Sequence, residues 1–164
     1  MEFHIEEWKD DGDIQRMFDL FLRDLGPEGY AMAYSTKMTR LDGERVFVAV
    51  NPYGKMMGWH TVRKVRPDTY RYRGGTFRDS RNLGVRMALR ECVARVAFED
   101  PECQELEGVI KATNAPQVVH CLKDHLSGAW MRLVKVTYKD GEVPALWFSL
   151  SRAQWDALDQ RSLG

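Results

Sequence analysis

Six residues in the middle of the chain, Arg81-Asn82-Leu83-Gly84-Val85-Arg86, have the types and order of a phosphate-binding loop. They follow a strand-like run and open a helix with apolar periodicity. In this arrangement the free backbone N–H groups of the loop and the positive end of the helix face the same anion. The sequence therefore predicts a site for a phosphorylated cofactor. Because a lone glycine before a helix is common, the order of the surrounding elements has to support this prediction.

The composition describes a folded protein with no net charge. Its 164 residues and mass of 19.0 kDa suit a single domain that spans 1–164. The 24 basic residues balance the 24 acidic ones, and 44% of the chain is hydrophobic. These values favour neither disorder nor a nucleic-acid partner.

Cysteine usage and the first residues indicate a cytoplasmic protein. The cysteines Cys92, Cys103 and Cys121 are odd in number and lack the short paired spacing of zinc sites. We therefore expect reduced thiols and no metal. The N-terminal residues are acidic, without the basic and apolar regions of a signal peptide, and no window approaches ~18 uninterrupted apolar residues. The sequence thus predicts no membrane segment.

Hydrophobic periodicity and turn residues divide the chain into strands and helices. Strands are expected at 3–8, 45–50, 56–65, 69–77, 105–113, 131–138 and 144–150. Helices are expected from the cap Asp13 to Gly26-Pro27, at 30–41, from Gly84 to before Pro101, at 115–126, and as a terminal turn capped by Ser151. The order is β-α-α-β-β-β-α-β-α-β-β, with the second to fourth strands as antiparallel neighbours.

This order, with the glycine loop between the fourth strand and the following helix, resembles the GNAT superfamily of N-acetyltransferases over nearly the whole chain. The resemblance implies an α/β (α+β) fold with a mixed, mostly antiparallel central sheet flanked by helices. In that family an R/Q-x-x-G-x-G/A loop binds the pyrophosphate of acetyl-CoA. Arg81 and Gly84 match this loop, but Arg86 stands where glycine or alanine is expected. Its side chain either narrows the approach to the phosphates or supplies a forked contact to them.

The resemblance implies acetyl-CoA as the acyl donor and suggests its contacts. Backbone amides around Thr76 and Phe77 would face the pantetheine and the thioester oxygen. Asn114, at the end of the fifth strand, would lie on the far side of the cofactor. The chain has a local excess of arginines, which either attracts the phosphates, docks an acidic acceptor or a nucleic acid, or forms a solvated face with salt bridges. These are Arg63, Arg66, Arg71, Arg73, Arg78, Arg81 and Arg86, and the phosphates are favoured near Arg78, Arg81 and Arg86. The pyrophosphate itself would be bound by Arg81, Asn82, Leu83, Gly84, Val85 and Arg86.

The groups that would move protons depart from the family pattern. Cys121 stands where the family places a tyrosine that acts as general acid, with His120 beside it. Cys121 is either the proton donor or a buried apolar residue, and His120 either takes part in the reaction or lies on the helix surface. The fourth strand contains no carboxylate, so Glu107 on the fifth strand and Asp79 beside the glycine loop are the candidate general bases. The alternatives are that Glu107 is an ordinary solvent-facing strand residue and that Asp79 is a turn former.

Four aromatic side chains fall on strands that border the acceptor cleft in the family. They are either acceptor contacts or packing residues, which is the commoner role of aromatic side chains in strands. The adjacent Gly74-Gly75 either lets a ligand approach the sheet closely or marks a bulge. The four residues are Trp59, His60, Tyr70 and Tyr72.

The sequence leads to the hypothesis of a cytoplasmic N-acetyltransferase that moves an acetyl group from acetyl-CoA to a primary amine of a small molecule or a protein. The alternative is a GNAT-shaped protein without catalysis, with a structural or macromolecule-binding role. Degenerate GNAT-like proteins of bacteriophages are of this kind, and the absent tyrosine and the residue Arg86 favour it. The resemblance also offers a homodimer as one arrangement. Neither a membrane nor a nucleic acid is an expected partner.

Overall fold

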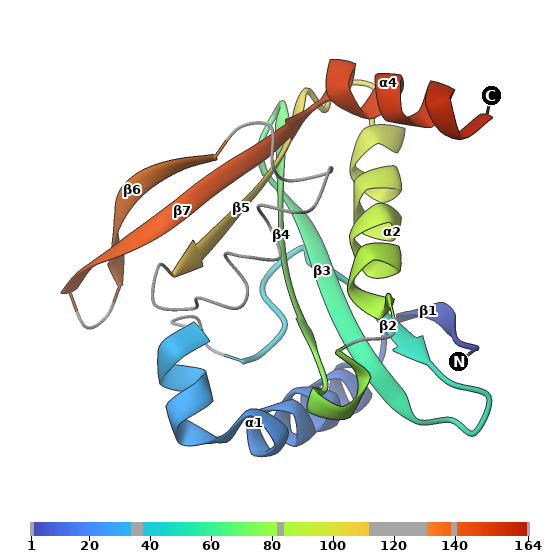
Figure 1. The fold of residues 1–164 in the computed structure, drawn as a ribbon, viewed down its shortest axis with the longest axis vertical. Helices are drawn as coiled ribbons and strands as arrows, with labels where there is room; N and C mark the ends of the chain where they lie inside the picture. The colour runs from blue at the N-terminus through green and yellow to red at the C-terminus, as the bar shows by residue number, and fades with distance from the viewer. Residues whose placement is uncertain (1, 34–37, 82–83, 112–130, 139–140, 164) are drawn as a thin grey trace.

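The computed structural model of the chain describes residues 2–33, 38–81, 84–111, 131–138 and 141–163 (Figure 1). Its centre is a seven-stranded sheet in the order β1-β2-β3-β4-β5-β7-β6. Strands β4 and β5 pair in parallel, and the other neighbouring strands pair antiparallel. The strands are β1 (His4–Trp8), β2 (Arg45–Val50), β3 (Met56–Arg66), β4 (Thr69–Thr76), β5 (Glu105–Lys111), β6 (Met131–Tyr138) and β7 (Gly141–Ser151).

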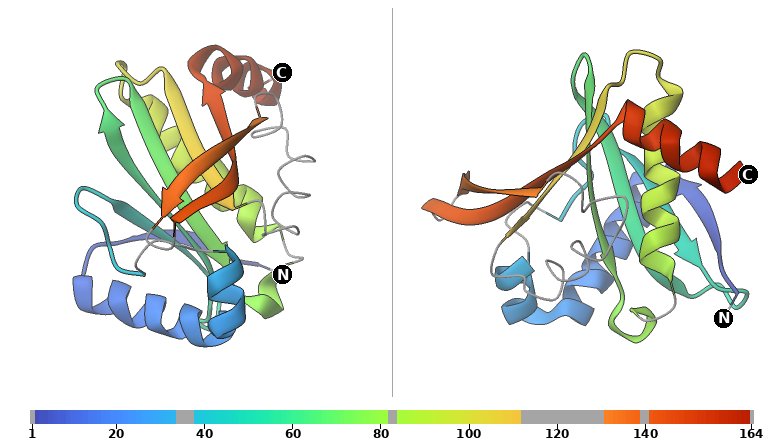
Figure 2. Two further views of the ribbon diagram at one scale, coloured as in Figure 1. Left: turned by 90° about the vertical axis from the view of Figure 1, so that its left-hand side faces the viewer. Right: turned by 45° about the horizontal axis from the view of Figure 1, so that its top comes forward.

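Helices cover both faces of the sheet, as Figures 1 and 2 show. Helix α1 (Asp11–Ala33) lies on one face and α2 (Val85–Glu99) on the other, while α4 (Arg152–Leu163) follows β7 directly. The short 3-10 helix η1 (Arg78–Ser80) lies between β4 and α2. The predicted mixed, mostly antiparallel sheet flanked by helices is confirmed.

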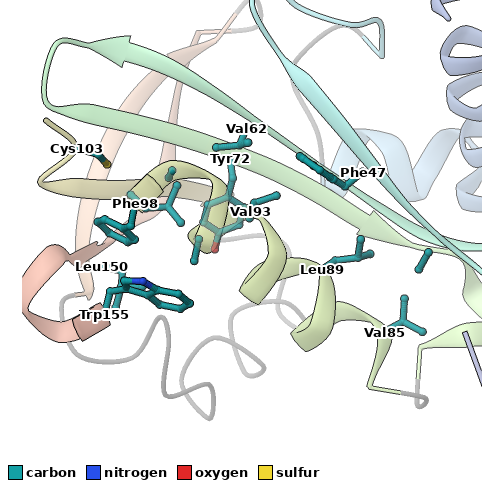
Figure 3. Packing of buried hydrophobic residues seen from close by; sticks show 14 of the residues in the cluster. Phe47, Val62, Tyr72, Val85, Leu89, Val93, Phe98, Cys103, Leu150 and Trp155 are labelled. Carbon is teal, nitrogen blue, oxygen red and sulfur yellow. The ribbon is translucent and has the colours of Figure 1, made fainter. Parts of the chain in front are cut away.

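β2 is apolar along most of its length because both of its faces are covered. Successive side chains of a strand point to opposite faces. Val46 and Val48 therefore pack with Phe18 of α1 in one core cluster. Phe47 packs with Leu89 of α2 in the other cluster (Figure 3). The strand thus joins the two halves of the hydrophobic core.

The start of α4 is fixed by a capping box and a buried tryptophan. The Gln154 N–H donates to Oγ of Ser151 at 3.1 Å, and the Ser151 N–H donates to the Gln154 side chain at 2.9 Å. Trp155 stacks on Phe98 at the end of α2, with 5.8 Å between ring centroids (Figure 3). The predicted Ser151 cap is confirmed.

Helix α1 begins earlier than predicted and contains a break. Its cap is Asp10 and not Asp13, because the Asp13 N–H donates to the Asp10 carboxylate at 2.9 Å. Gly26 interrupts the helix with φ of 76° and ψ of 165°, and Pro27 opens a second helical part that ends at Ala33. The helix predicted at 30–41 is therefore wrong in its last part, since residues 38–41 are not helical.

Several strand and helix bounds follow the prediction closely, and others differ. β2, β6 and the end of α2 before Pro101 agree with it, and β5 agrees as far as Lys111, the last described residue of that segment. β7 differs, because it spans Gly141–Ser151. The helix predicted at 115–126 lies outside the described residues. Within the described ranges, every helix is too short or too polar to cross a membrane.

Candidate cofactor and acceptor site

Strands β4 and β5 run together for only a short distance. They pair at Thr69 with Glu105, Tyr70 with Leu106 and Arg71 with Glu107. Beyond Arg71, β4 continues to Thr76 beside β3 alone, and β5 continues beside β7. Figures 1 and 2 show the two strands moving apart. One edge of β4 therefore borders a divergence in the middle of the sheet.

The direction of the β4 amides follows from its pairing with β3. The Phe77 N–H donates to the Met57 carbonyl at 3.0 Å, so the Phe77 amide faces β3. Because amides alternate in direction along an antiparallel strand, the amide of Thr76 points toward the divergence. The Phe77 amide, which the sequence assigned to the thioester, is occupied, and that part of the prediction is wrong. The Phe77 ring packs edge-on against Phe21 of α1, with 5.5 Å between centroids.

The divergence leads to the N-terminus of α2. Gly84 is the residue before this helix and has left-handed backbone angles, φ 70° and ψ 4°, which glycine adopts without strain. A Cβ atom at Gly84 would meet nothing within 4 Å. No side chain of the described residues caps the helix, and its first turn contains no acidic residue. Its first N–H groups and the positive end of its dipole are thus arranged as anion-binding groups.

The side chains around this helix start have different environments. Arg78 is held against α1, where its N–H donates to Asp24 at 2.8 Å and its guanidinium to the Leu25 carbonyl at 3.4 Å. Arg81 is exposed, Arg86 is half-buried, and Val85 is buried in the core. Other predicted site residues lie outside the described residues: Asn82, Leu83, Asn114, His120 and Cys121.

The four aromatic residues predicted for the acceptor cleft do not line one surface. Trp59 is fully buried against Phe18 on the α1 face. His60, Tyr70 and Tyr72 point to the α2 face, because strand side chains alternate. The four residues therefore do not share a cleft, and the alternative role of packing holds for Trp59, His60 and Tyr72, which are core residues.

Tyr70 has a structural role at the far end of α2. Its hydroxyl donates to the Asp100 carboxylate at 2.8 Å. Partial burial and this hydrogen bond raise the pKa of Tyr70 to about 12. The hydroxyl therefore stays protonated at physiological pH.

His60 is buried and neutral. Its Nδ1 lies 2.7 Å from the Trp59 carbonyl, which can only accept, so Nδ1 carries the proton. Burial, together with the charges of Arg90 and Arg86, lowers the pKa of His60 to about 3. The imidazole stacks on Tyr72 with 5.8 Å between centroids. Gly74 lies opposite His60 in the strand pairing, so this glycine makes room for the ring.

Glu107 is buried and is not the solvent-facing residue that the sequence offered as an alternative. Its Oε1 accepts from Arg66 at 2.6 Å and from Arg71 at 3.3 Å, and its Oε2 accepts from Nε1 of Trp147 at 2.7 Å. Burial by itself raises the pKa of Glu107, but the hydrogen bond from Trp147 and the charges of Arg71 and Arg66 lower it overall. A carboxylate whose two oxygens are occupied in this way is a poor general base.

A second buried carboxylate, Glu44, lies on the same α1 face. Its two oxygens accept from Arg73 at 2.7 and 2.8 Å, and the Leu41 N–H donates to it at 2.6 Å. Thr61 also donates to it. Glu44 is not predicted as a site residue from the sequence, whereas Arg66, Arg71 and Arg73 belong to the local excess of arginines that the sequence shows.

Comparison of the structure with solved structures returns acetyltransferases of the GNAT fold. A provisionally assigned acetyltransferase from Acinetobacter baylyi ADP1 is 18% identical with a TM-score of 0.68, over 92% of this chain and 93% of that one. The spermidine/spermine N-acetyltransferase SpeG from Vibrio cholerae is 10% identical with a TM-score of 0.67, over 96% and 98%. The aminoglycoside acetyltransferase AAC(6')-Ib, solved with coenzyme A and kanamycin, is 12% identical with a TM-score of 0.63, over 95% and 98%.

No protein-family model and no curated protein sequence matches the chain. At identities of 10 to 18% the structural likeness concerns the fold. The chain therefore has the GNAT fold, with the divergent central strands and the glycine-led helix described above. Among the described residues no group of three or more potential metal ligands occurs.

Proposed function

We propose that this protein is an acyltransferase that moves an acetyl group from acetyl-CoA to a primary amine. The observation that carries the proposal is the divergence of β4 from β5 beyond Arg71, which leads to the uncapped N-terminus of α2. The proteins of the same fold that are solved with coenzyme A support the choice of cofactor.

The residues around Gly84 suit the phosphates of such a cofactor. The left-handed glycine leaves open space above the first turn of α2, and the helix N-terminus favours negative charge. Arg81 and the half-buried Arg86 add positive charge beside it. Asn82, Leu83 and Asn114 remain predicted contacts of the cofactor.

The thioester of acetyl-CoA supplies the acetyl group, and the protein has to orient the reactants. The Thr76 amide is the proposed donor to the thioester oxygen, because it points toward the divergence. Holding an amine against the thioester contributes much of the rate, on the order of 7 kcal/mol or more of the barrier. Cys121 and His120 remain the predicted proton donors, whereas Glu107 is better described as a residue that fixes the sheet.

Calorimetric titration with acetyl-CoA tests the cofactor site. We expect saturable binding by the wild type and its loss in Gly84→Trp, where the side chain blocks the space above α2. Gly43→Trp is the matched control. Gly43 also has a positive φ, 75°, and an added Cβ atom there would meet nothing within 4 Å, but this glycine precedes β2 and not α2. A well-folded wild type that binds no acetyl-CoA would refute the proposal and direct the search to macromolecular partners.

A further inference from the structure

Three arginines gather on the α1 face of the sheet at the point where β4 and β5 begin to diverge. Arg63 of β3 lies directly opposite Arg71 of β4, and Arg71 lies beside Glu107 of β5. Arg66 reaches the same carboxylate at 2.6 Å. Because strand side chains alternate, Arg71 lies on the same face as Arg73, which contacts α1. We call Arg63, Arg66 and Arg71 the arginine cluster.

The arginine cluster carries more positive charge than the described residues around it neutralise. Glu107 is the single carboxylate that pairs with it in the described part of the chain. Arg63 forms no ion pair with any described residue and is partly exposed. Like charges directly opposite each other on adjacent strands, such as Arg63 and Arg71, are destabilising. An acidic group bound from outside would remove this repulsion.

The arginine cluster also has a hydrogen-bond donor to offer. The Nε atom of Arg71 is buried without a hydrogen-bond partner among the described residues, although 40% of the side chain is exposed. Such a donor costs free energy until an acceptor reaches it. The planar fork of a guanidinium matches the geometry of a carboxylate. The cluster therefore suits an acidic side chain of another molecule.

The length of β4 sets the size of the molecule that can reach from the cluster to the thioester. Arg71 lies five residues from Thr76, whose amide is the proposed donor to the thioester oxygen, which is about 17 Å at ~3.3 Å per residue. β4 runs between them as one strand (Figure 1). A small amine is too short to place an anionic group at the cluster and its nitrogen at the acetyl group. An extended polypeptide covers the same distance with about five residues.

The part of β4 between these two ends offers no second anchor for an acid. Arg73 is the only charged residue of the sequence between Arg71 and Thr76, and its side chain is 14% exposed. Its guanidinium donates to Glu44 at 2.7 and 2.8 Å and to the Thr39 carbonyl. An acidic side chain at an intermediate position would meet an arginine whose charge is already neutralised. The surface can therefore select the spacing between an amine and an acid.

The reacting amine has to be neutral, and the two carboxylates considered as general bases are both engaged. Both oxygens of Glu107 accept hydrogen bonds, and Asp79 pairs with Lys55. An amine with a low pKa depends least on a base. At pH 7.5 about a third of polypeptide α-amines are neutral, against about 0.1% of lysine side chains. An N-terminal α-amine is therefore the polypeptide amine that suits this site best.

We infer that the acceptor of this protein is the N-terminal amine of a polypeptide, and that the arginine cluster binds an acidic side chain about five residues further along that polypeptide. The inference rests on the proposed function and names its substrate class. Cofactor phosphates at Gly84 and the acidic side chain of the acceptor would occupy opposite ends of β4. A nucleic acid fits less well, because it is bound by a continuous basic surface, whereas Glu44 neutralises Arg73 between the two ends.

A series of eight-residue peptides, assayed with acetyl-CoA by release of the CoA thiol, tests the inference without changing the protein. The peptides consist of alanine and glycine after an N-terminal serine, and each ends in an amide. One carries aspartate at its sixth position, one glutamine at the sixth position, and one aspartate at the second position. We expect a KM about tenfold lower for the first peptide than for the other two. Equal KM values, or a preference for aspartate at the second position, would overturn the inference.

The position of the acetyl group on the product tests the choice of amine. Mass spectrometry should find the acetyl group on the N-terminal α-amine of the peptide with aspartate at its sixth position. The matched peptide has a blocked N-terminus and a lysine in place of the serine, and we expect it to be acetylated at least tenfold more slowly because its amine is protonated at pH 7.5. Faster acetylation of the lysine peptide would overturn the assignment to an α-amine.

Arg63→Gln tests the arginine cluster itself, because Arg63 has no described ion pair to lose on substitution. The tenfold preference in KM for aspartate over glutamine at the sixth position should fall below about twofold. Lys64→Gln is the matched control, since it removes one positive charge from the next position of β3, on the α2 face, where Lys64 pairs with Asp100. This control should keep the preference. Equal losses in the two variants, or an undiminished preference in Arg63→Gln, would contradict the role of the cluster.

Titration of the wild type with acetyl-CoA separates this inference from the proposed function. Acetyl-CoA binding without a preference among the peptides would reject the substrate class and keep the acyltransferase proposal. Absence of acetyl-CoA binding would reject both. Titration with a single-stranded oligothymidylate covers the other class of partner: binding that is lost in Arg63→Gln, without use of the peptides, would overturn the inference in favour of a nucleic acid.

Discussion

Gly74 and His60 lie opposite each other on β4 and β3, and a Cβ atom on Gly74 would stand 2.7 Å from Cγ of the His60 ring. Carbon atoms in proteins do not approach this closely, so any side chain at Gly74 requires the buried imidazole to move. The glycine that the sequence associates with ligand approach therefore has a packing reason on the α2 face.

Gly74→Ala should destabilise the protein by about 1–3 kcal/mol, the usual cost of forcing extra volume into a packed core. The measurement is denaturant unfolding of both single variants and of Gly74→Ala combined with His60→Ala. If the imidazole causes the cost, Gly74→Ala should cost much less in the His60→Ala background, which gives a coupling energy. Equal costs in the two backgrounds would mean that the strand needs glycine for another reason.

The neutral state of His60 predicts a dependence of stability on pH. Its pKa of about 3 lies below the ordinary value of 6.5. Below pH 6.5, His60 therefore binds a proton in the unfolded chain but not in the folded chain. Stability should fall between pH 6.5 and pH 3, with a limiting slope of about 1.4 kcal/mol per pH unit from this residue. Urea unfolding of the wild type and His60→Gln at several pH values measures it.

Between pH 5 and pH 6.5 the loss of stability that comes from His60 should amount to about 2 kcal/mol. An unchanged slope in His60→Gln would show that His60 titrates normally and is not held neutral by burial.

Glu107→Gln should lower stability rather than act on the chemical step. The new amide nitrogen cannot accept from Trp147 when the amide oxygen faces the arginines, so we expect a loss of about 1–3 kcal/mol in urea unfolding. The lowered pKa of Glu107 also predicts that its stabilisation is present above about pH 4.5 and is lost as the pH falls through the lower folded value. This acid-range loss should be reduced in Glu107→Gln.

Kinetics distinguish this structural role of Glu107 from that of a general base. The pKa of Glu107 lies below its ordinary value and both of its oxygens are occupied. Replacing Glu107 by Gln should therefore leave the pH profile of kcat unchanged above pH 6. Loss of the acid limb of that profile, which is the fall of kcat as an essential base becomes protonated, with the variant still folded, would restore Glu107 as the base.

The sequence predicts the order of helices and strands well because each element has its own local pattern of apolar and turn residues. The apolar run 45–50, the turn at Asn51 and the periodicity of 85–97 each depend on neighbours in the chain. The same local reading assigned Trp59 and His60 to one cleft, although consecutive strand residues point to opposite faces. Their environments depend on α1 and α2, which approach from distant parts of the sequence.

The environment of Glu107 could not be predicted for a related reason. Its partners Arg66, Arg71 and Trp147 come from three different strands, 36 to 41 residues away along the chain. Only the pairing of β4 with β5, and of β5 with β7, brings them together. Charged residues inside predicted strands indicate such sites, but the sequence does not show which residues they pair with.

The cap of α1 offers a direct comparison between the sequence prediction and the structure. Asp10 accepts the Asp13 N–H at 2.9 Å and its carbonyl accepts the Ile14 N–H at 3.0 Å. Asp13, the predicted cap, lies one turn inside and pairs with Arg16 on the surface. Asp10→Ala should lower the stability by about 1 kcal/mol. Asp13→Ala should change the stability by no more than about 0.5 kcal/mol. Thermal or urea unfolding of the two variants measures the difference, and a larger loss in Asp13→Ala would return the helix start to the position that the sequence indicated.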